Sequence, residues 1–214
     1  MRTAADLRRA AARAGLQVVG IERVPIAGGG HTLSARMRFT DPWAAARLLT
    51  NLSDEDAADP VVRAWSLGIL DGAARVNLPA NANGMSGPVV LPAMVRAFNR
   101  SVHGSVQQAI RFVREPRETF QAARVTMKAK AGDCDDHARL VHALAKASGS
   151  MARQVFFQRD GQPVHVVEQL YDPDDEGMGG RWRWAETTIP AAYGEHPQAA
   201  YLRLKREGRI PARR

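Results

Sequence analysis

The segment from residue 132 onward limits the possible folds most strongly, because a helical pattern is followed there by several strand patterns. Residues 134–147 have helical spacing, and Ser148-Gly149 ends the pattern. Three strand candidates follow, at residues 153–159, 165–171 and 181–187. The first two are joined by Asp-Gly-Gln-Pro, a hairpin signal. The pattern predicts an α+β fold in which the helix covers a sheet.

The predicted helix has two stripes of different polarity. Its apolar stripe has helical spacing and consists of Cys134, Ala138, Val141 and Ala145. The second stripe is interpreted as solvated and consists of Asp135, Arg139, His142 and Lys146. This places the cysteine in the first turn, on the side that faces the core, and assigns no role to His142.

The rest of the chain divides into a small N-terminal unit, a larger domain and a tail. A helix at 3–14, two strands at 16–26 and 31–39, and a helix at 42–52 predict a small α/β unit. The acidic stretch 53–60 is a candidate boundary, helices are predicted at 60–75 and 91–113, and 114–131 has no clear period. The predicted parts are a helix-hairpin-helix unit at 1–52, a domain at 60–198 and a loose basic tail at 199–214.

Charge and composition narrow the function classes. The formal net charge of +8 favours anionic partners, but aromatic residues are only 6%, which leaves little material for stacking on single-stranded nucleic acid. Nucleic acid is therefore not expected as a specific partner. The N-terminus lacks the apolar core of a secretory signal, and no apolar run is long enough to cross a bilayer. We expect a soluble protein of the cytoplasm with no membrane partner.

Cys134 is the single cysteine of the chain, so neither an internal disulfide nor a multi-thiolate zinc site is possible within it. A thiol becomes a nucleophile when its thiolate is stabilised, and a helix N-terminus and a nearby imidazole both do this. His165 opens the middle strand of the predicted sheet, so it is the leading base. Glu186 lies on the next strand, on a face with two tryptophans, where a carboxylate needs a partner. We therefore predict a Cys134–His165–Glu186 triad.

The stretch GDCDDHARLVHALAKASG, the hairpin with His165 and the ending WRWAETT together resemble the transglutaminase-like superfamily of cysteine enzymes. The likeness extends over residues 60–198, is strongest over 131–150 and is closest to transglutaminase-like proteins of tailed bacteriophages and prophages. It implies a papain-like core with Cys134 as nucleophile, His165 as base and Glu186 as orienting acid. That family usually has Asp where this chain has Glu186, so Asp172 is kept as the alternative acid.

Several side chains near the motif have simpler interpretations. His137 is a rival base, but we expect it to bond Asp133 or to pack under the preceding helix. Asp133, Asp135 and Asp136 suit the helix start as cap and first-turn residues, and they are assigned no metal. Trp182 and Trp184 are interpreted as core residues. No cofactor is predicted.

The resemblance and the chemistry together predict a cysteine hydrolase or acyltransferase that acts on amide bonds, with peptidase or amidase chemistry favoured over cross-linking. The expected substrate is a peptide, a protein or a peptidoglycan-like amide. The alternative is a non-catalytic structural or assembly protein of a phage particle, which residues 1–52 would dock to other phage proteins. The expected location is the host cytoplasm, with association with the virion as the alternative.

Overall fold

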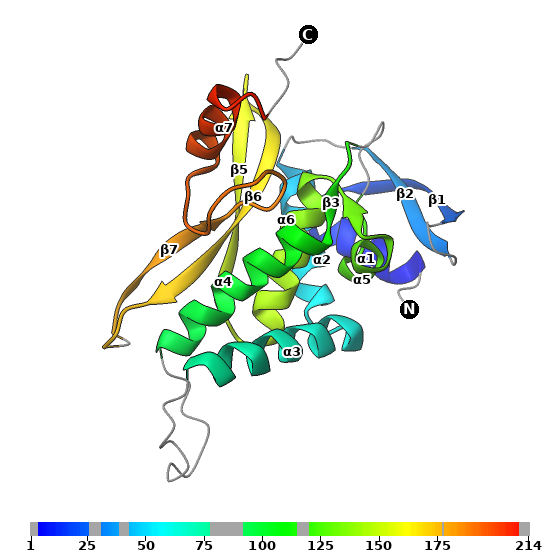
Figure 1. The fold of residues 1–214 in the computed structure, drawn as a ribbon. Helices are drawn as coiled ribbons and strands as arrows, with labels where there is room; N and C mark the ends of the chain where they lie inside the picture. Colours follow the sequence, from blue (N-terminus) through cyan, green and yellow to red (C-terminus); the bar gives the residue numbers. More distant parts are fainter. Residues whose placement is uncertain are drawn as a thin grey trace.

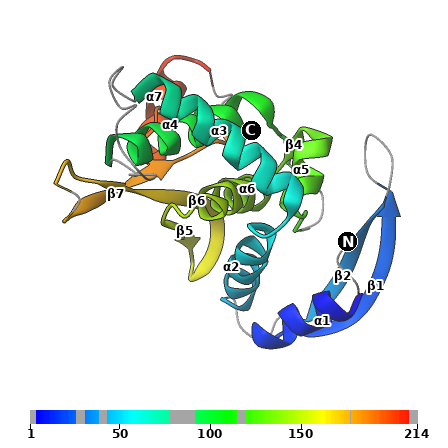
Figure 2. The same ribbon diagram turned by 90° about the horizontal axis from the view of Figure 1, so that it is seen from below.

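The N-terminal part folds around a small core of its own. The computed structural model describes residues 4–25, 31–38, 43–77, 92–114, 120–176 and 178–209. Helix α1 (Ala4–Arg13) is followed by the antiparallel strands β1 (Gln17–Pro25) and β2 (His31–Arg38) and by helix α2 (Ala44–Asp56). The hairpin lies at the edge of the molecule, far from the second sheet (Figures 1 and 2). The small core consists of Ala11, Ala14, Leu16, Ala44, Leu48 and Leu52.

Besides the hairpin and a short parallel pair of β3 (Arg111–Phe112) and β4 (Ala131–Gly132), the described residues form a second, larger sheet with three antiparallel strands in the order β5-β6-β7. These are β5 (Ala152–Arg159), β6 (Gln162–Pro173) and β7 (Gly180–Ala185). They correspond to the three predicted strands, and a turn through Asp160 and Gly161, both at positive φ, joins the first two. The α+β class and the antiparallel sheet predicted from the sequence are confirmed.

Helix α6 (Cys134–Ala147) is the centre of the domain and has the bounds that the sequence predicted. It packs on β5 and β6 from one side (Figure 2). On its other sides it contacts α2, α3 (Pro60–Asn77), α4 (Pro92–Ala109) and α5 (Ala123–Ala129). The main core joins α3, α4, α6 and the sheet, and its largest fully buried members include Phe98, Leu140, Leu144 and Leu170.

The solvated stripe predicted for α6 is wrong for three of its four members, and only Lys146 is exposed as predicted. Asp135, Arg139 and His142 are all at most 3% exposed, because neighbouring elements surround the helix. The Arg139 guanidinium donates to Asp56 of α2 over 2.6 Å and to the Phe120 carbonyl over 3.1 Å. A polar stripe on a helix is therefore buried here through specific partners on other elements.

Three further expectations need correction. The acidic stretch at 53–60 is not a plain boundary, since α2 continues to Asp56 and buries Ser53 and Asp56. The segment without a clear period contains α5, a helix of seven residues. The C-terminal stretch is not loose as far as residue 206, because α7 (Pro197–Arg206) buries Ala200 and Leu204.

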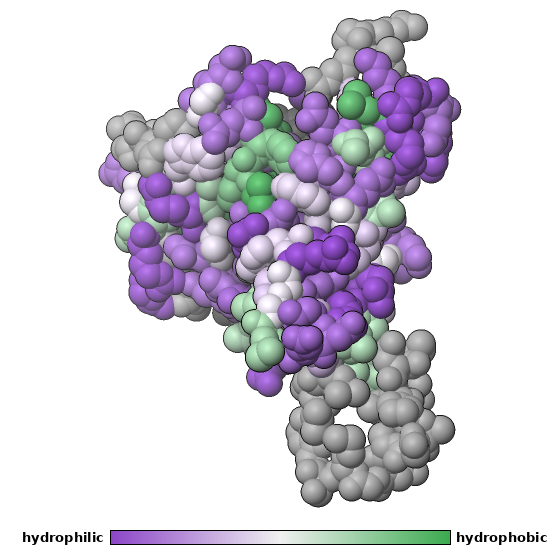
Figure 3. Space-filling model, turned by 90° about the vertical axis from the view of Figure 1, so that its left-hand side faces the viewer, coloured by the Kyte–Doolittle hydropathy of each residue, from purple (hydrophilic) through white to green (hydrophobic). Residues whose placement is uncertain are grey.

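The face formed by β7 and α7 carries both polar and apolar areas. Figure 3 shows it as mainly hydrophilic, with the largest apolar area in its upper middle part and smaller ones elsewhere. Among the residues that the structure describes, no helix combines the length and the apolar character needed to cross a membrane. The predicted division of the chain into parts at 1–52, 60–198 and 199–214 remains a prediction.

His142 lies between two carboxylates that come from different elements. Its Nδ1 is 2.9 Å from Glu168 of β6, and its Nε2 is 3.0 Å from Asp54 of α2. Burial by itself lowers the pKa of His142, but the hydrogen bonds and charges of Glu168 and Asp54 outweigh it and raise that pKa. Burial raises the pKa of the fully buried Glu168 to about 7, against the lowering effect of His142.

These two shifts predict that the His142–Glu168 pair stabilises the fold more in mild acid than in mild alkali, against the opposite effect of the buried His103 and His137, whose pKa values are lowered. Both pKa values of the pair are higher in the folded state, so the folded chain retains protons that the unfolded chain releases. The resulting stabilisation is complete below the unfolded pKa values and is lost as the pH rises through about 7 and through the raised pKa of His142. We expect the contribution of this pair, measured with urea as the difference in the free energy of unfolding between the parent and Glu168→Gln, to fall by on the order of 2 kcal/mol from pH 5 to pH 9.

Glu168→Gln supplies the control for this prediction, because the amide can still bond His142 but does not titrate. Its free energy of unfolding should depend less steeply on pH than that of the parent. Equal pH dependence in the two proteins would show that the pair does not cause the effect.

Candidate active site

The start of α6 is fixed by a set of acidic side chains around Cys134. Asp133 is the N-cap in extended backbone, and Asp136 accepts a hydrogen bond from the Asp133 amide as part of a capping box. The Asp136 carboxylate also accepts from the backbone and side-chain nitrogens of Gln121, over 2.8 and 2.7 Å. Gly132 is needed here, since an added Cβ would come within 2.6 Å of the Asp136 Cβ. These contacts explain the Gly-Asp-Cys-Asp-Asp motif as a helix start that holds Cys134 in a fixed place.

Cys134 is half-buried, and it packs against the small apolar cluster of Leu49, Ala138 and Val166. Its first neighbours in the chain are acidic, and the Sγ atom and the carboxylate oxygens of Asp133 and Asp135 lie within 4.8 Å of one another. Negative charge this close opposes formation of the thiolate. The helix start favours it, since its N–H groups carry partial positive charge. A reactive thiol at this position therefore needs a further positive group.

The same three residues form the group of potential metal ligands found in the described part of the chain. Two carboxylates and one thiol offer a mixed set of donors. Asp133 is already explained as a helix cap, as the sequence predicted, and we assign no metal to the group.

His165 and Glu186 are in direct contact, with 2.8 Å between Nε2 and Oε2. The strand register explains this contact, because Glu168 pairs with Ala185 at the end of β7. Glu186 is therefore not on the strand as predicted but directly after it, at the His165 end of β6. The longer side chain of glutamate spans the remaining gap. Since Glu186 takes Nε2, Nδ1 is the ring nitrogen that could exchange a proton with a thiol.

Glu186 is a charged group in a buried place. Its side chain is 1% exposed, whereas that of His165 is 30% exposed. Burial alone would raise the pKa of Glu186, but hydrogen bonds from His165 and from the amide and hydroxyl of Thr188 outweigh it and lower that pKa. A fixed negative charge of this kind orients the imidazole.

Asp172, the alternative acid, lies elsewhere in the structure. It is seven residues from His165 on β6, a separation of about 23 Å along an extended strand. Its Oδ1 accepts hydrogen bonds from Asn99 and from the Tyr193 hydroxyl. The structure therefore brings Glu186, and not Asp172, to His165.

His137, the rival base, is buried one turn along α6 from Cys134. Its Nδ1 faces the Thr187 hydroxyl at 3.0 Å, and not Asp133 as one of the two sequence expectations had it. Burial lowers its pKa more than the nearby charge of Glu186 raises it, so the neutral ring is favoured. Its visible role is to join the first turn of α6 to the residue after Glu186.

Trp182 and Trp184 are half-exposed, so the prediction that they are core residues is wrong. Trp184 packs against Phe157 and His196, with ring centroids 5.8 and 4.8 Å apart, and Phe157 in turn packs against His165. Trp182 packs against Tyr171 and the Arg153 guanidinium. A row of rings formed by Phe157, Trp184 and His196 therefore continues from the imidazole.

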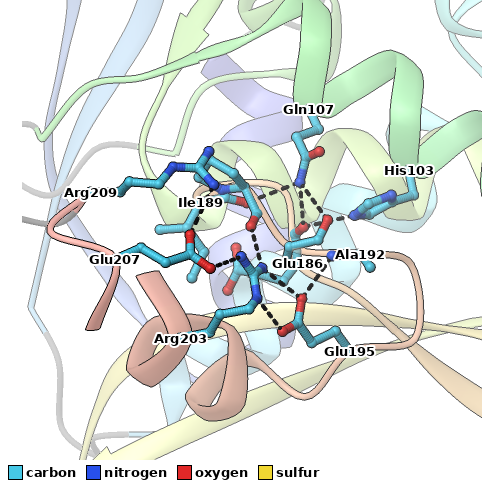
Figure 4. A network of polar contacts seen from close by, with 11 residues as sticks. His103, Gln107, Glu186, Ile189, Ala192, Glu195, Arg203, Glu207 and Arg209 are labelled. Carbon is cyan, nitrogen blue, oxygen red and sulfur yellow. Dashed lines mark hydrogen bonds and ion pairs between the residues drawn. The ribbon is translucent and has the colours of Figure 1, made fainter. Parts of the chain in front are cut away.

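Two functional candidates on α4 escaped the sequence interpretation. His103 Nε2 lies 2.9 Å from the Glu186 carbonyl oxygen, and the Gln107 amide donates to the same oxygen over 3.3 Å (Figure 4). The sequence carried a signal for them, because His103 and Gln107 directly follow Val102 and Val106, two apolar residues spaced for one side of a helix that are both buried.

Comparison with known families agrees with this arrangement. Residues 92–187, from the start of α4 to just beyond Glu186, match the transglutaminase-like superfamily. The chain therefore carries a transglutaminase-like domain, as the resemblance predicted. Comparisons with curated proteins and with solved structures gave no match.

Proposed function

We propose that this protein is a cysteine hydrolase or acyltransferase that acts on amide bonds, with Cys134 as nucleophile, His165 as base and Glu186 as orienting acid. The observation that carries the proposal is the hydrogen bond between His165 and the buried, charged Glu186, in a domain whose central helix begins with the only cysteine. The superfamily is typically one of cysteine hydrolases and acyltransferases, which supports the same reaction class.

The reaction begins with transfer of the Cys134 proton to His165. The thiolate sulfur then adds to the amide carbonyl carbon, and the carbonyl π electrons move onto oxygen to give a tetrahedral oxyanion. Backbone N–H groups at the start of α6, including that of Cys134, are the proposed donors to this oxyanion. Collapse breaks the C–N bond, the imidazolium protonates the leaving amine, and a thioester remains on Cys134.

The acyl group of the thioester is then transferred to water or to a second amine. His165 removes a proton from that acceptor while it adds, and the Cys134 thiolate leaves when the second tetrahedral intermediate collapses. We favour water, which makes the enzyme a peptidase or amidase. The proposed substrate is a peptide, a protein or a peptidoglycan-like amide.

Activity of the full chain on a panel of amides tests this proposal. The panel contains fluorogenic peptide amides, peptidoglycan fragments, and a glutamine peptide offered with a dye-labelled amine. We expect the parent to release amine from at least one of them and Cys134→Ala to lose at least about 1,000-fold in rate. Cleavage that continues in Cys134→Ala would refute the proposed nucleophile.

The second candidate is a non-catalytic assembly protein of a phage particle that uses residues 1–52 for docking. The observation in its favour is that α1, β1 and α2 share a small core, and the β1–β2 hairpin lies at the edge of the molecule (Figure 2). An assembly role should survive Cys134→Ala, whereas an enzyme should lose its effect. A phage or prophage origin and the host cytoplasm as location are proposed for both candidates, with association with the virion as the alternative location. Docking to phage proteins through residues 1–52 is proposed for the second.

A further inference from the structure

Helix α4 carries three polar side chains, spaced four residues apart, that contact β6 or the segment after β7. These are Asn99, His103 and Gln107, and the first two are at most 4% exposed. Spacing of four residues places them on one side of a helix. Polar groups buried among apolar ones need partners, so the contacts of each side chain show what it holds in place.

The three side chains hold two different parts of the chain. The Asn99 amide donates to the Tyr171 carbonyl over 2.9 Å and to the Asp172 carboxylate over 3.0 Å, at the far end of β6. His103 and Gln107 instead bind the Glu186 carbonyl oxygen. The Gln107 amide also donates to the carbonyls of Ile189 and Ala191, over 2.9 and 3.0 Å.

The stretch held by His103 and Gln107 has already left the sheet. Strand β7 ends at Ala185, so the ladder with β6 no longer fixes the backbone from Glu186 onward. Because His103 Nε2 faces a carbonyl oxygen, this nitrogen donates. Burial lowers the pKa of His103 more than the Glu186 contacts raise it, which favours the neutral ring.

The same stretch is held from the opposite side by α7. The Arg203 guanidinium donates to the Pro190 carbonyl over 2.9 Å and binds both carboxylate oxygens of Glu195 (Figure 4). Glu195 in turn accepts a hydrogen bond from the Ala192 amide. The 186–192 backbone therefore lies between two helices, each of which contacts it through side chains.

From these contacts we infer that His103 and Gln107 are positioning residues, which hold the 186–191 backbone so that the Glu186 carboxylate stays against His165. This inference rests on the proposed function for its catalytic consequence. The carboxylate takes its other hydrogen bonds from Thr188 of the same stretch, so a shift of this backbone carries both the acid and its partners. Displacements of about 1 Å are enough to lower a rate substantially.

The test compares Gln107→Ala, His103→Ala and His103→Gln with Asn99→Ala. The last is a matched control, since it removes a buried α4 side chain with hydrogen bonds that do not reach Glu186. Three quantities are measured in the full chain: the melting temperature, the exchange rate of the Thr188 amide proton by NMR, and the pH midpoint of Cys134 alkylation by iodoacetamide.

We expect all the alanine variants to melt at lower temperature than the parent. Gln107→Ala and His103→Ala should exchange the Thr188 amide at least about 10-fold faster and alkylate at a higher pH midpoint. Asn99→Ala should leave both unchanged, and His103→Gln, which keeps an N–H donor, should stay near the parent. Equal Thr188 exchange in Gln107→Ala and Asn99→Ala would overturn the inference.

The two readouts separate this inference from the proposed function. If the alkylation midpoint of the parent does not respond to His165→Ala, the proposed triad fails. Exchange at Thr188 still decides the positioning role in that case, because it reports the place of the Glu186 carboxylate and needs no turnover.

Discussion

Replacing His165 by Ala is expected to move the pH midpoint of Cys134 alkylation to or above about 8.5, the reference for an unperturbed thiol. The parent should alkylate with a midpoint below that value, because a protonated imidazole stabilises the thiolate. Without the imidazole, the thiol keeps the two nearby carboxylates of Asp133 and Asp135, which oppose its ionisation. The rate of alkylation by iodoacetamide at pH 7 should fall by about 10-fold or more. Mass spectrometry of the single cysteine measures this rate.

Glu186→Gln and Asp172→Asn make this experiment specific. The side-chain amide introduced by Glu186→Gln can still bond His165 but carries no charge, so the pH midpoint of alkylation should rise by less than in His165→Ala. Asp172 is a buried carboxylate of β6 whose hydrogen bonds lead to Asn99 and Tyr193. Asp172→Asn should therefore leave the midpoint unchanged. A parent thiol that is slow, and indifferent to His165, would indicate that the site no longer supports nucleophilic catalysis.

Local sequence signals predicted the elements that carry the candidate site. The bounds of α6 follow from the cap at Asp133 and the turn at Ser148-Gly149, and the hairpin signal separates β5 from β6. The pairing of His165 with Glu186 was predicted from the order of the strands. It depends on a register that only the folded sheet fixes, which is why Asp172 remained an alternative until the structure was available.

The predictions that failed concern side chains whose partners are distant in the sequence. Arg139 and His142 have the spacing of a solvated stripe, yet their partners Asp56 and Asp54 are 83 and 88 residues away. Helical periodicity alone does not distinguish a polar side chain in water from one that is paired inside the protein. His103 was missed for the same reason, since its partner is a backbone carbonyl 83 residues later.

The pairing of Arg139 with Asp56 leads to the largest expected loss of stability. The guanidinium and the carboxylate are 1% and 6% exposed, and 2.6 Å separates Nε from Oδ2. Asp56 also accepts a hydrogen bond from the Ala123 amide, so the pair joins α2 and the start of α5 to the central helix. Arg139→Met removes the charge and leaves a buried carboxylate without its cation, which should lower the free energy of unfolding by about 3–5 kcal/mol.

Two controls separate the buried charge from lost packing. Arg124 of α5 makes an ion pair with Asp59, which follows the end of α2, over 3.8 Å, but its side chain is 41% exposed. Arg124→Met should therefore cost less than about 1 kcal/mol. The double variant Asp56→Leu with Arg139→Met removes both charges, and it should recover part of the loss because no buried carboxylate remains. If urea unfolding gives the same loss for Arg139→Met and Arg124→Met, the buried ion pair does not hold α2 on the domain. If the single variant alone is strongly destabilised, α2 is attached through a charge pair that the sequence pattern had assigned to solvent.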